Sequence, residues 1–190
     1  MIQFTRKDLP LKSMITIYEY RLNEPKMDKE IIKQIDKMGD TQQQRTNVKA
    51  QMTDWVMWDN PGFKDLANIV LKMVPDITRD KYNRKEFRPE IKDMWGMKYR
   101  DKQIAIEHDH WPCAWSGVYY VKGPKDAPGL YFPEMGDQGG ERQFEPGLLM
   151  FFPGHTRHAV RRKDFKGNRY VVAFNLYEHK GYELKTVLNS

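Results

Sequence analysis

The chain has 190 residues, a formal net charge of +6 and an aromatic content of 13%. This length predicts one domain with a sizeable core, and the aromatic content argues against a disordered chain. No apolar run is long enough for a membrane helix, the first residues lack the apolar segment of a secretory signal, and the single cysteine, Cys113, excludes an internal disulfide framework. We therefore expect a cytoplasmic protein, whose modest charge permits nucleic acid as a partner without requiring it.

Two amphipathic helices are predicted in the first half of the chain. Residues 28–38 have helical spacing, with Asp28 as a candidate N-cap. A second helix is expected to begin at Asn60 and Pro61 and to stop at Pro75, because proline has no backbone N–H with which to continue a helix. The other elements expected in this part are a strand over Met14–Tyr20 and a polar loop over Thr41–Val48.

From about Asp93 onward the apolar residues recur with period two, which predicts short strands. The strands are expected near Met94–Tyr99, Gln103–His110, Trp115–Val121, Gly129–Phe132, Leu148–Phe152, Arg157–Arg162 and Arg169–Tyr177. Glycine and proline between such short strands favour a mainly β sandwich or barrel. The segment Lys122–Pro146, rich in glycine, proline and charge, is either a disordered connector or an insertion at the mouth of the fold that grips a substrate.

His108 and His110 lie two residues apart at the end of a predicted strand, where side chains alternate between the two faces. Both imidazoles are therefore expected on the face that also carries Ile106, while Asp109 lies on the opposite face. A polar strand end is the simpler interpretation of such a pair. The sharper interpretation is that the two histidines are ligands of a metal ion.

His158 lies about 50 residues further on, directly after an apolar strand and a turn at Phe152-Pro153. Three histidines on one side of a metal ion would leave open positions opposite them, as oxygen-activating non-heme iron requires. His155 is expected in the turn itself with a surface role, and His179 is expected in solvent near the polar C-terminus.

The last predicted strand has one face of small residues next to an arginine. Alternation places Arg169, Val171, Ala173 and Asn175 on this face. A guanidinium beside small side chains can bind a carboxylate through two parallel hydrogen bonds, with room left for the ligand. An ordinary arginine at a sheet edge is the alternative interpretation.

The order of these motifs along the chain resembles a known family. The motifs are, in chain order, Trp95-x-x-x-Tyr99, His108-x-His110, Ser116-Gly117-Val118-Tyr119-Tyr120, Phe152-Pro153 followed by His158, and Arg169 with Phe174-Asn175. Together they resemble the Fe(II)- and 2-oxoglutarate-dependent oxygenases, and among these a bacterial and phage subset, over roughly Trp95 to Asn175. The sequence contains no phosphate-binding P-loop, serine-nucleophile elbow or CxxC pair that would favour another class.

The resemblance implies a mainly β protein with flanking helices (α+β), built on a double-stranded β-helix, or cupin-like jelly-roll, core. It implies one oxygenase domain over residues 1–190, in which residues 1–90 support a core at 91–178 and residues 179–190 form a tail. The iron ligands that it implies are His108, His110 and His158. The residues that it implies for 2-oxoglutarate are Arg169 at the distal carboxylate, with Tyr99, Tyr120 and Asn175 as further contacts. No catalytic side chain is implied beyond the metal ligands.

Two positions depart from the wider family that the chain resembles. Most members have aspartate or glutamate where this chain has His110. A neutral imidazole then replaces an anion, so the metal site carries one more unit of positive charge and attracts Fe(II) less strongly. Many members have a serine where this chain has Val171, so one hydrogen bond to the cosubstrate must come from elsewhere or be missing.

The function implied by the resemblance is that of an iron(II)- and 2-oxoglutarate-dependent dioxygenase, a hydroxylase of a protein side chain or small molecule that releases succinate and CO2. Its expected partners are 2-oxoglutarate, dioxygen and that substrate, and exposed sheet edges make a homodimer a reasonable expectation. The location expected for a phage-encoded protein is the host cytoplasm. Two alternatives stay open: a three-histidine cupin-like metalloenzyme that needs no 2-oxoglutarate, and a non-catalytic jelly-roll binding module.

Overall fold

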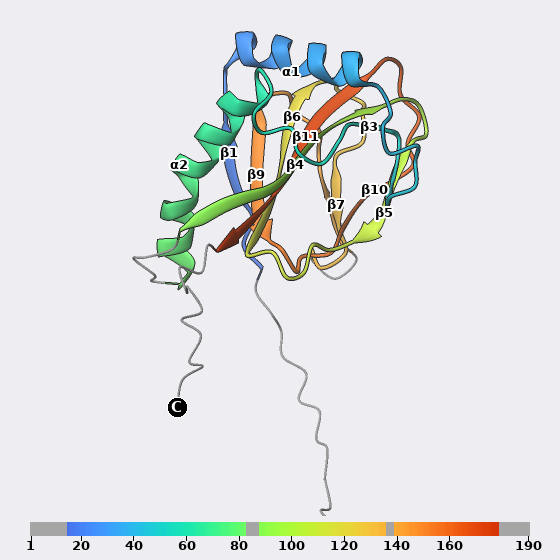
Figure 1. The fold of residues 1–190 in the computed structure, drawn as a ribbon. Helices are drawn as coiled ribbons and strands as arrows, with labels where there is room; N and C mark the ends of the chain where they lie inside the picture. The colour runs from blue at the N-terminus through green and yellow to red at the C-terminus, as the bar shows by residue number, and fades with distance from the viewer. Residues whose placement is uncertain (1–14, 83–87, 136–138, 179–190) are drawn as a thin grey trace, which may run out of the picture.

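The computed structural model describes residues 15–82, 88–135 and 139–178, in which two antiparallel β-sheets face each other (Figure 1). The larger sheet has the strand order β1 (Tyr18–Arg21), β9 (Leu148–Pro153), β6 (Trp115–Lys122), β11 (Arg169–Glu178), β4 (Pro89–Tyr99) and β3 (Gln51–Met52). The smaller sheet has the order β2 (Val48–Lys49), β5 (Ile104–His108), β10 (His158–Val160), β7 (Leu130–Phe132) and β8 (Gly140–Arg142).

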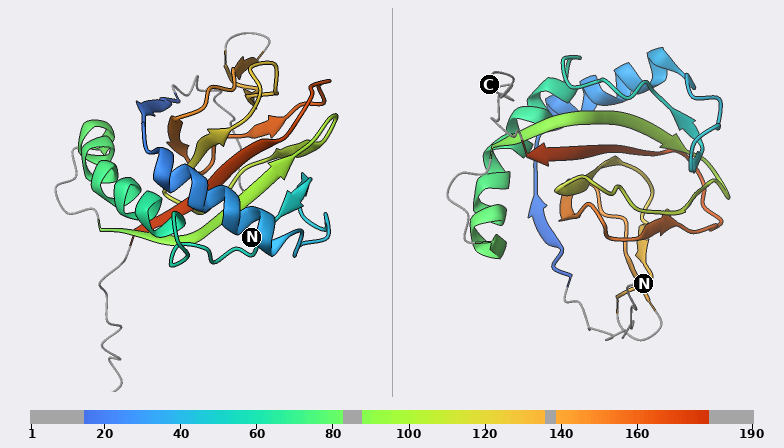
Figure 2. Two further views of the ribbon diagram at one scale, coloured as in Figure 1. Left: turned by 90° about the horizontal axis from the view of Figure 1, so that it is seen from above. Right: turned by 60° about the horizontal axis from the view of Figure 1, so that its bottom comes forward.

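Strands β4 to β11 pass back and forth between the two sheets. β4, β6, β9 and β11 are neighbours in the larger sheet, and β5, β7, β8 and β10 are neighbours in the smaller one. Two interleaved sheets of this kind form a double-stranded β-helix, or jelly roll, so the predicted fold class of a mainly β core with flanking helices is confirmed (Figure 2). An apolar core that includes Met97, Val118 and Phe152 fills the space between the sheets.

Helices α1 (Pro25–Met38) and α2 (Phe63–Tyr82) pack on the outer face of the larger sheet (Figures 1 and 2). Gly96 of β4 lies beneath both of them, and a side chain at this position would overlap with Ile35 of α1 and Phe63 of α2. The glycine therefore lets the helices lie close to the sheet. None of the helices in the described residues is long and apolar enough to cross a membrane.

The start of α1 differs from the prediction. The helix begins at Pro25, a turn earlier than expected, with Glu24 at the N-cap. Proline fits this position because the first N–H groups of a helix have no partner within it. Asp28 is thus not the cap. Its carboxylate instead accepts a hydrogen bond from the Tyr119 hydroxyl of β6 at 2.8 Å, which ties the helix to the sheet.

The predicted stop of α2 at Pro75 is wrong. The helix continues to Tyr82, because its buried face extends past the proline through Ile77 and Thr78. Pro75 itself is exposed, and the Thr78 hydroxyl accepts a hydrogen bond from the Trp115 indole at 3.2 Å. Burial of this face against the sheet outweighs the single backbone hydrogen bond that proline removes.

The strands follow the predicted order; β4, β6, β9 and β11 are longer than predicted, whereas β5, β7 and β10 are shorter. β1 covers Tyr18–Arg21 rather than Met14–Tyr20, and Met14 lies outside the described residues. The sequence does not predict β2, β3 and β8, because segments of two or three residues are too short to show a period. In the segment Lys122–Pro146, β7 and β8 belong to the smaller sheet, so a disordered connector is the wrong interpretation for the described parts of it.

Candidate metal centre

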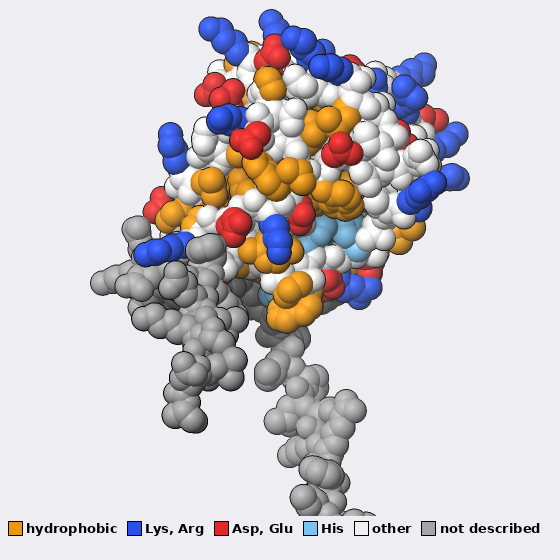
Figure 3. Space-filling view, viewed as in Figure 1, with side chains coloured by type: hydrophobic (Ala, Val, Ile, Leu, Met, Phe, Trp, Pro, Cys, Tyr) orange, Lys and Arg blue, Asp and Glu red, His pale blue; other side chains and the backbone are white. Residues whose placement is uncertain are grey.

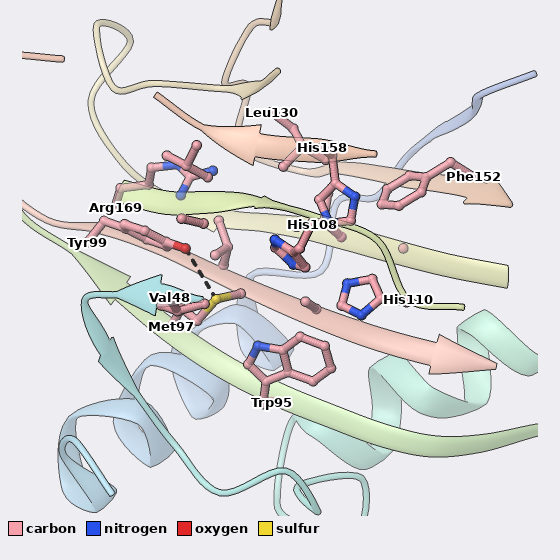
Figure 4. A pocket seen from close by; sticks show the side chains of 16 residues that line it. Val48, Trp95, Met97, Tyr99, His108, His110, Leu130, Phe152, His158 and Arg169 are labelled. Atoms are coloured by element: carbon pink, nitrogen blue, oxygen red, sulfur yellow. Dashed lines mark hydrogen bonds between the residues drawn. The ribbon is translucent and has the colours of Figure 1, made fainter. Parts of the chain in front are cut away.

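Three histidines come together between the two sheets. Every pair among the ligand nitrogens of His108, His110 and His158 lies within 4.8 Å. His108 at the end of β5 pairs directly with His158 at the start of β10, and the ring centroids of these two residues are 4.5 Å apart. Figure 4 shows the three rings grouped at one end of a pocket. The predicted trio is therefore assembled as one cluster.

The His108 side chain points into the pocket, but not because of the simple strand alternation that the sequence predicts. Ala105 and His108 line the pocket, whereas Ile106 is 47% exposed, so Ile106 and His108 do not share a face. The pairing explains this difference: two steps along β10, from His158 to Val160, match three steps along β5. The extra residue on β5 is a β-bulge, which reverses the alternation and turns His108 inward.

His110 lies beyond the end of β5, in the turn that follows, and not on the strand that the sequence predicts. Its backbone N–H donates to the Gly154 carbonyl at 2.7 Å, and its carbonyl accepts from the Cys113 N–H at 2.8 Å. The first hydrogen bond ties this segment to the residue that follows β9, and the second closes the turn itself. Asp109 is exposed and accepts a hydrogen bond from the Trp111 backbone N–H at 3.0 Å, so it is not part of the cluster.

Hydrogen bonds determine which ring nitrogen of two histidines is free to bind a metal. Nδ1 of His108 lies 2.6 Å from the Ile106 carbonyl, and Nδ1 of His158 lies 2.9 Å from the Thr156 carbonyl. A carbonyl oxygen can only accept, so both Nδ1 atoms carry the proton and both Nε2 atoms keep a free lone pair. Backbone carbonyls commonly orient metal-binding histidines in this way.

The imidazoles of the cluster are held in their neutral form. Burial, and then the neighbouring imidazoles, lower the pKa of His158 to about 3. Burial, and then His108, lower the pKa of His110 to about 4, and burial also lowers the pKa of His108. Neutral imidazole is the form that binds a metal, so these side chains need not lose a proton to do so near pH 7.

A cavity of about 40 Å³ connects the three histidines with Arg169. Its walls are largely apolar and include Met97, Leu130 and Val171. Arg169, the first residue of β11, is only 1% exposed. Its Nε and Nη1 atoms have no hydrogen-bond partner among the described residues. Figure 4 places the guanidinium at the opposite end of the pocket from the histidines.

Aromatic rings, rather than carboxylates, surround the Arg169 guanidinium. Its Cζ atom lies 4.7 Å from the ring centroid of Tyr99, 5.4 Å from that of Tyr120 and 5.3 Å from that of Phe144. Ring faces attract the cation but leave the N–H groups of its Nε and Nη1 atoms without an acceptor. A buried charge with unused donors is costly, so the pocket is suited to an anionic ligand that accepts these hydrogen bonds.

The other residues predicted to contact a cosubstrate lie in different places. Tyr99 lines the pocket, and burial raises the pKa of its hydroxyl to about 12, so the hydroxyl stays a neutral donor. Tyr120 contacts Arg169 through its ring, while its hydroxyl points to the Arg142 carbonyl at 3.5 Å. Asn175 is not among the residues lining the pocket, and its side chain accepts a hydrogen bond from Ser116 instead.

Sequence reasoning missed two residues of the pocket region. Trp95, which the sequence predicts as core, lines the pocket with its ring centroid 5.9 Å from that of His110. Trp95 and Tyr99 are four residues apart on one strand, so their side chains lie on the same face. This spacing could have predicted that Trp95 lines the same pocket as Tyr99. Phe144 lies in a loop before β9 and contacts Arg169. A loop has no periodic pattern of apolar residues, so the sequence could not predict this contact.

The remaining histidines lie outside the cluster. His155 is exposed in the turn after β9, in agreement with its predicted surface position. His179 lies outside the described residues. Large exposed apolar side chains also occur close to the cluster in sequence, among them Trp111, which is 75% exposed. The space-filling view shows histidine at the surface, flanked by hydrophobic and acidic side chains (Figure 3).

Comparison with known proteins gives structural neighbours only. No protein-family model and no curated protein matches the sequence. The viral collagen prolyl hydroxylase of Paramecium bursaria Chlorella virus-1, in complex with 2-oxoglutarate, is 15% identical, with 84% of this chain and 94% of that chain covered and a TM-score of 0.63. A Trichoplax adhaerens prolyl hydroxylase bound to a hypoxia inducible factor peptide fragment is 14% identical, with coverages of 87% and 84% and a TM-score of 0.63.

A third neighbour is HygX from Streptomyces hygroscopicus, with nickel, 2-oxoglutarate and hygromycin B bound. It is 10% identical to this chain, with 86% of this chain and 83% of that chain covered and a TM-score of 0.65. Identities this low show likeness of fold alone. The chain therefore shares the jelly-roll fold of these neighbours, of which the viral hydroxylase and HygX have 2-oxoglutarate bound.

Proposed function

We propose that this protein is an iron(II)- and 2-oxoglutarate-dependent dioxygenase that hydroxylates its substrate and releases succinate and CO2. The observation that carries the proposal is one pocket with three neutral imidazoles at one end and, at the other, the buried guanidinium of Arg169, whose Nε and Nη1 have no hydrogen-bond partner among the described residues. The jelly-roll fold shared with 2-oxoglutarate-binding neighbours supports it.

His108, His110 and His158 are the residues that would hold the iron. Their nitrogens are close enough together to bind one ion, and imidazole is a suitable ligand for iron. Three protein ligands are fewer than iron can take, so a cosubstrate could bind the same ion. The bound metal, with its cosubstrate, supplies the oxidising chemistry, and the protein supplies position and a confined pocket.

Arg169 would bind the distal carboxylate of 2-oxoglutarate. Its unused Nε and Nη1 donors suit a carboxylate, and the Tyr99 hydroxyl is a neutral donor in the same pocket. A dianionic ligand would also offset the positive charge of a metal held by neutral imidazoles alone. The apolar walls would keep water away from the reacting groups.

A prolyl side chain of a peptide is the first substrate to test. Exposed Trp55 and Trp111, 38% and 75% accessible, offer flat apolar surfaces for a peptide near the pocket. Three of the structural neighbours are prolyl hydroxylases, one of them bound to a peptide. HygX, bound to hygromycin B, makes a small molecule the second class to test.

The test is succinate formation from 2-oxoglutarate by the Fe(II)-loaded protein, with proline-containing peptides added and peptide mass measured for a gain of one oxygen. Arg169→Ala should abolish succinate formation, while Arg161→Ala, at an arginine whose guanidinium lies over the Tyr131 ring, serves as the control. If the Fe(II)-loaded wild-type protein neither binds 2-oxoglutarate nor converts it to succinate, the proposal is wrong.

The lack of a carboxylate in the histidine cluster favours one alternative, a metalloenzyme that needs no 2-oxoglutarate. That function predicts that Arg169→Ala keeps both metal and activity. A non-catalytic binding module predicts no stoichiometric iron at all. Metal analysis and the arginine variant thus separate the three functions.

A further inference from the structure

Two side chains with unused buried nitrogens line the same pocket. Within the described residues, the buried side-chain nitrogens without a hydrogen-bond partner are Nε and Nη1 of Arg169 and Nε1 of Trp95. Both residues line the cavity that holds the three histidines. Arg169 has a role in the proposed function, whereas Trp95 has none, and the family resemblance assigns it none.

Trp95 lies at the histidine end of the pocket. It pairs with Ala173 across β4 and β11, four residues along from the pair of Tyr99 with Arg169. Four residues of strand span about 13 Å, so the indole and the guanidinium extend into the pocket from backbone positions at its two ends. Figure 4 shows the Trp95 indole below His108 and His110, with its nitrogen on the side of Met97.

The indole is held in place by its neighbours. Trp95 is 3% exposed, and its ring centroid lies 4.8 Å from that of Trp55 in an edge-on contact and 5.9 Å from that of His110. Packing on both sides fixes the ring, so its N–H cannot turn to water without disturbing the wall of the pocket. A fixed donor of this kind is prepared for an acceptor that arrives with a ligand.

Within the part of the chain that the structure describes, the Trp95 Nε1–H has no hydrogen-bond acceptor. An indole N–H only donates, the cluster contains no carboxylate, and Asp109 is bonded to the Trp111 backbone instead. Nδ1–H of His108 and of His158 already bond to backbone carbonyls. A ligand in the pocket can supply the missing acceptor.

We propose that Trp95 Nε1 donates a hydrogen bond to the carboxylate at the keto-acid end of bound 2-oxoglutarate. This inference rests on the proposed function. Trp95 then binds one end of the dicarboxylate while Arg169 binds the other, and the indole determines how the keto-acid end lies beside His110. The indole N–H thus gives the carboxylate a hydrogen bond at the end of the pocket where the three protein ligands of the metal are neutral imidazoles.

Nuclear magnetic resonance of the Zn(II)-loaded protein tests this contact directly, because zinc is diamagnetic and silent in redox chemistry. The chain has five tryptophans. Trp95→Phe identifies the indole signal of Trp95 by its disappearance. On addition of 2-oxoglutarate, the Trp95 N–H signal should move downfield and exchange more slowly with water, while the signal of Trp58, which does not line the pocket, should change little.

Affinity gives a second readout. Trp95→Phe keeps an aromatic ring and lacks the N–H, so the Kd for 2-oxoglutarate should rise about tenfold, as expected for one hydrogen bond to a charged group. Trp58→Phe, at a partly buried tryptophan that packs against the core beneath the two helices and does not line the pocket, is the matched control and should change the Kd less than about twofold. Replacement of Trp95 by 3-benzothienylalanine, which keeps the two-ring shape without the N–H, should reproduce the loss if Trp95→Phe folds poorly.

The outcomes separate the inference from the proposed function. Binding of 2-oxoglutarate with an unmoved Trp95 signal, or with the same Kd in the benzothienyl variant, overturns the role of Trp95 and leaves the oxygenase proposal intact. Absence of 2-oxoglutarate binding in the metal-loaded wild-type protein overturns both.

Discussion

At the scale of single residues, burial has opposite consequences for the two ends of the pocket. At one end it removes the imidazoles from water and keeps them neutral, with the pKa of His158 lowered to about 3. At the other end the guanidinium of Arg169 keeps its charge, because arginine does not lose its proton in proteins. The contrast creates a ligand site with metal-binding lone pairs at one end and a cation at the other.

Removal of one imidazole should abolish stoichiometric metal binding. His158→Ala leaves two ligands and should weaken Fe(II) binding by more than about 100-fold, a larger effect than the loss of a group that only orients a ligand. Metal content after gel filtration and a titration with Co(II) measure the loss. His155→Ala removes an exposed histidine from the adjacent turn and should bind metal like the wild type. Equal metal content in both variants would contradict the three-histidine site.

Acid should destabilise the metal-free protein through these same histidines. The pKa of His110 falls from 6.5 to about 4 on folding and that of His158 to about 3, so the unfolded chain binds more protons below pH 6.5. The free energy of unfolding should therefore decrease as the pH falls from 6.5 toward 4. Urea unfolding at several pH values measures it, and His158→Asn should flatten the curve. A stability that stays level or rises in acid would exclude this linkage.

At the scale of single elements, β5 explains both the success and the failure of the sequence analysis. The order of the motifs identified His108 and His110 correctly as neighbours of His158. The predicted alternation was wrong, because a bulge in β5 places Ala105, not Ile106, on the inner face. A bulge depends on how two distant strands pair, and a single strand's pattern contains no information about its partner.

The second helix shows the same difference between local and tertiary information. Proline predicts a stop at Pro75, yet the buried face continues through Ile77. The cost of proline within the helix is one lost hydrogen bond and a steric conflict. The burial of several apolar side chains against the sheet stabilises the helix by more than this cost. The helix ends where packing ends, and the sequence alone does not reveal which neighbours will cover it.

Pro75→Ala should stabilise the protein if α2 is continuous. Alanine restores a backbone donor in the middle of the helix, so the free energy of unfolding should rise by about 1–3 kcal/mol. Lys72→Ala, at an exposed position one turn earlier, is the control and should change stability by less than about 0.5 kcal/mol. Urea unfolding compares the variants. Destabilisation by Pro75→Ala would mean that the helix breaks at the proline.

At the scale of the whole molecule, the pocket exists because two sheets close over it. His108 and His158 come from the smaller sheet, whereas Trp95 and Arg169 come from the larger one. The period-two pattern predicted the strands, and the family resemblance predicted the jelly roll. Neither could predict that the Asn175 side chain accepts a hydrogen bond from Ser116 rather than facing the pocket. The single-domain bounds, a homodimer and the cytoplasmic location stay predictions.

Ligand binding should stabilise the whole fold, since both sheets contribute to the pocket. With 2-oxoglutarate at a hundredfold excess over its Kd, metal-loaded protein should gain about 2.7 kcal/mol in free energy of unfolding. Thermal unfolding with metal alone and with metal plus 2-oxoglutarate measures the gain. Glutaramide, which has the five-carbon chain without either charge, is the control ligand. A gain of equal size with the control would argue against recognition by Arg169.

The most direct test of the central claim is an anaerobic titration of the Fe(II)-loaded protein with 2-oxoglutarate, followed by the visible charge-transfer absorption of the chelate. The account predicts that the band appears and saturates in the wild-type protein. It also predicts that Arg169→Ala loses the band at the same concentrations while retaining its iron. Iron binding without any band in the wild-type protein, or an undiminished band in Arg169→Ala, would contradict it.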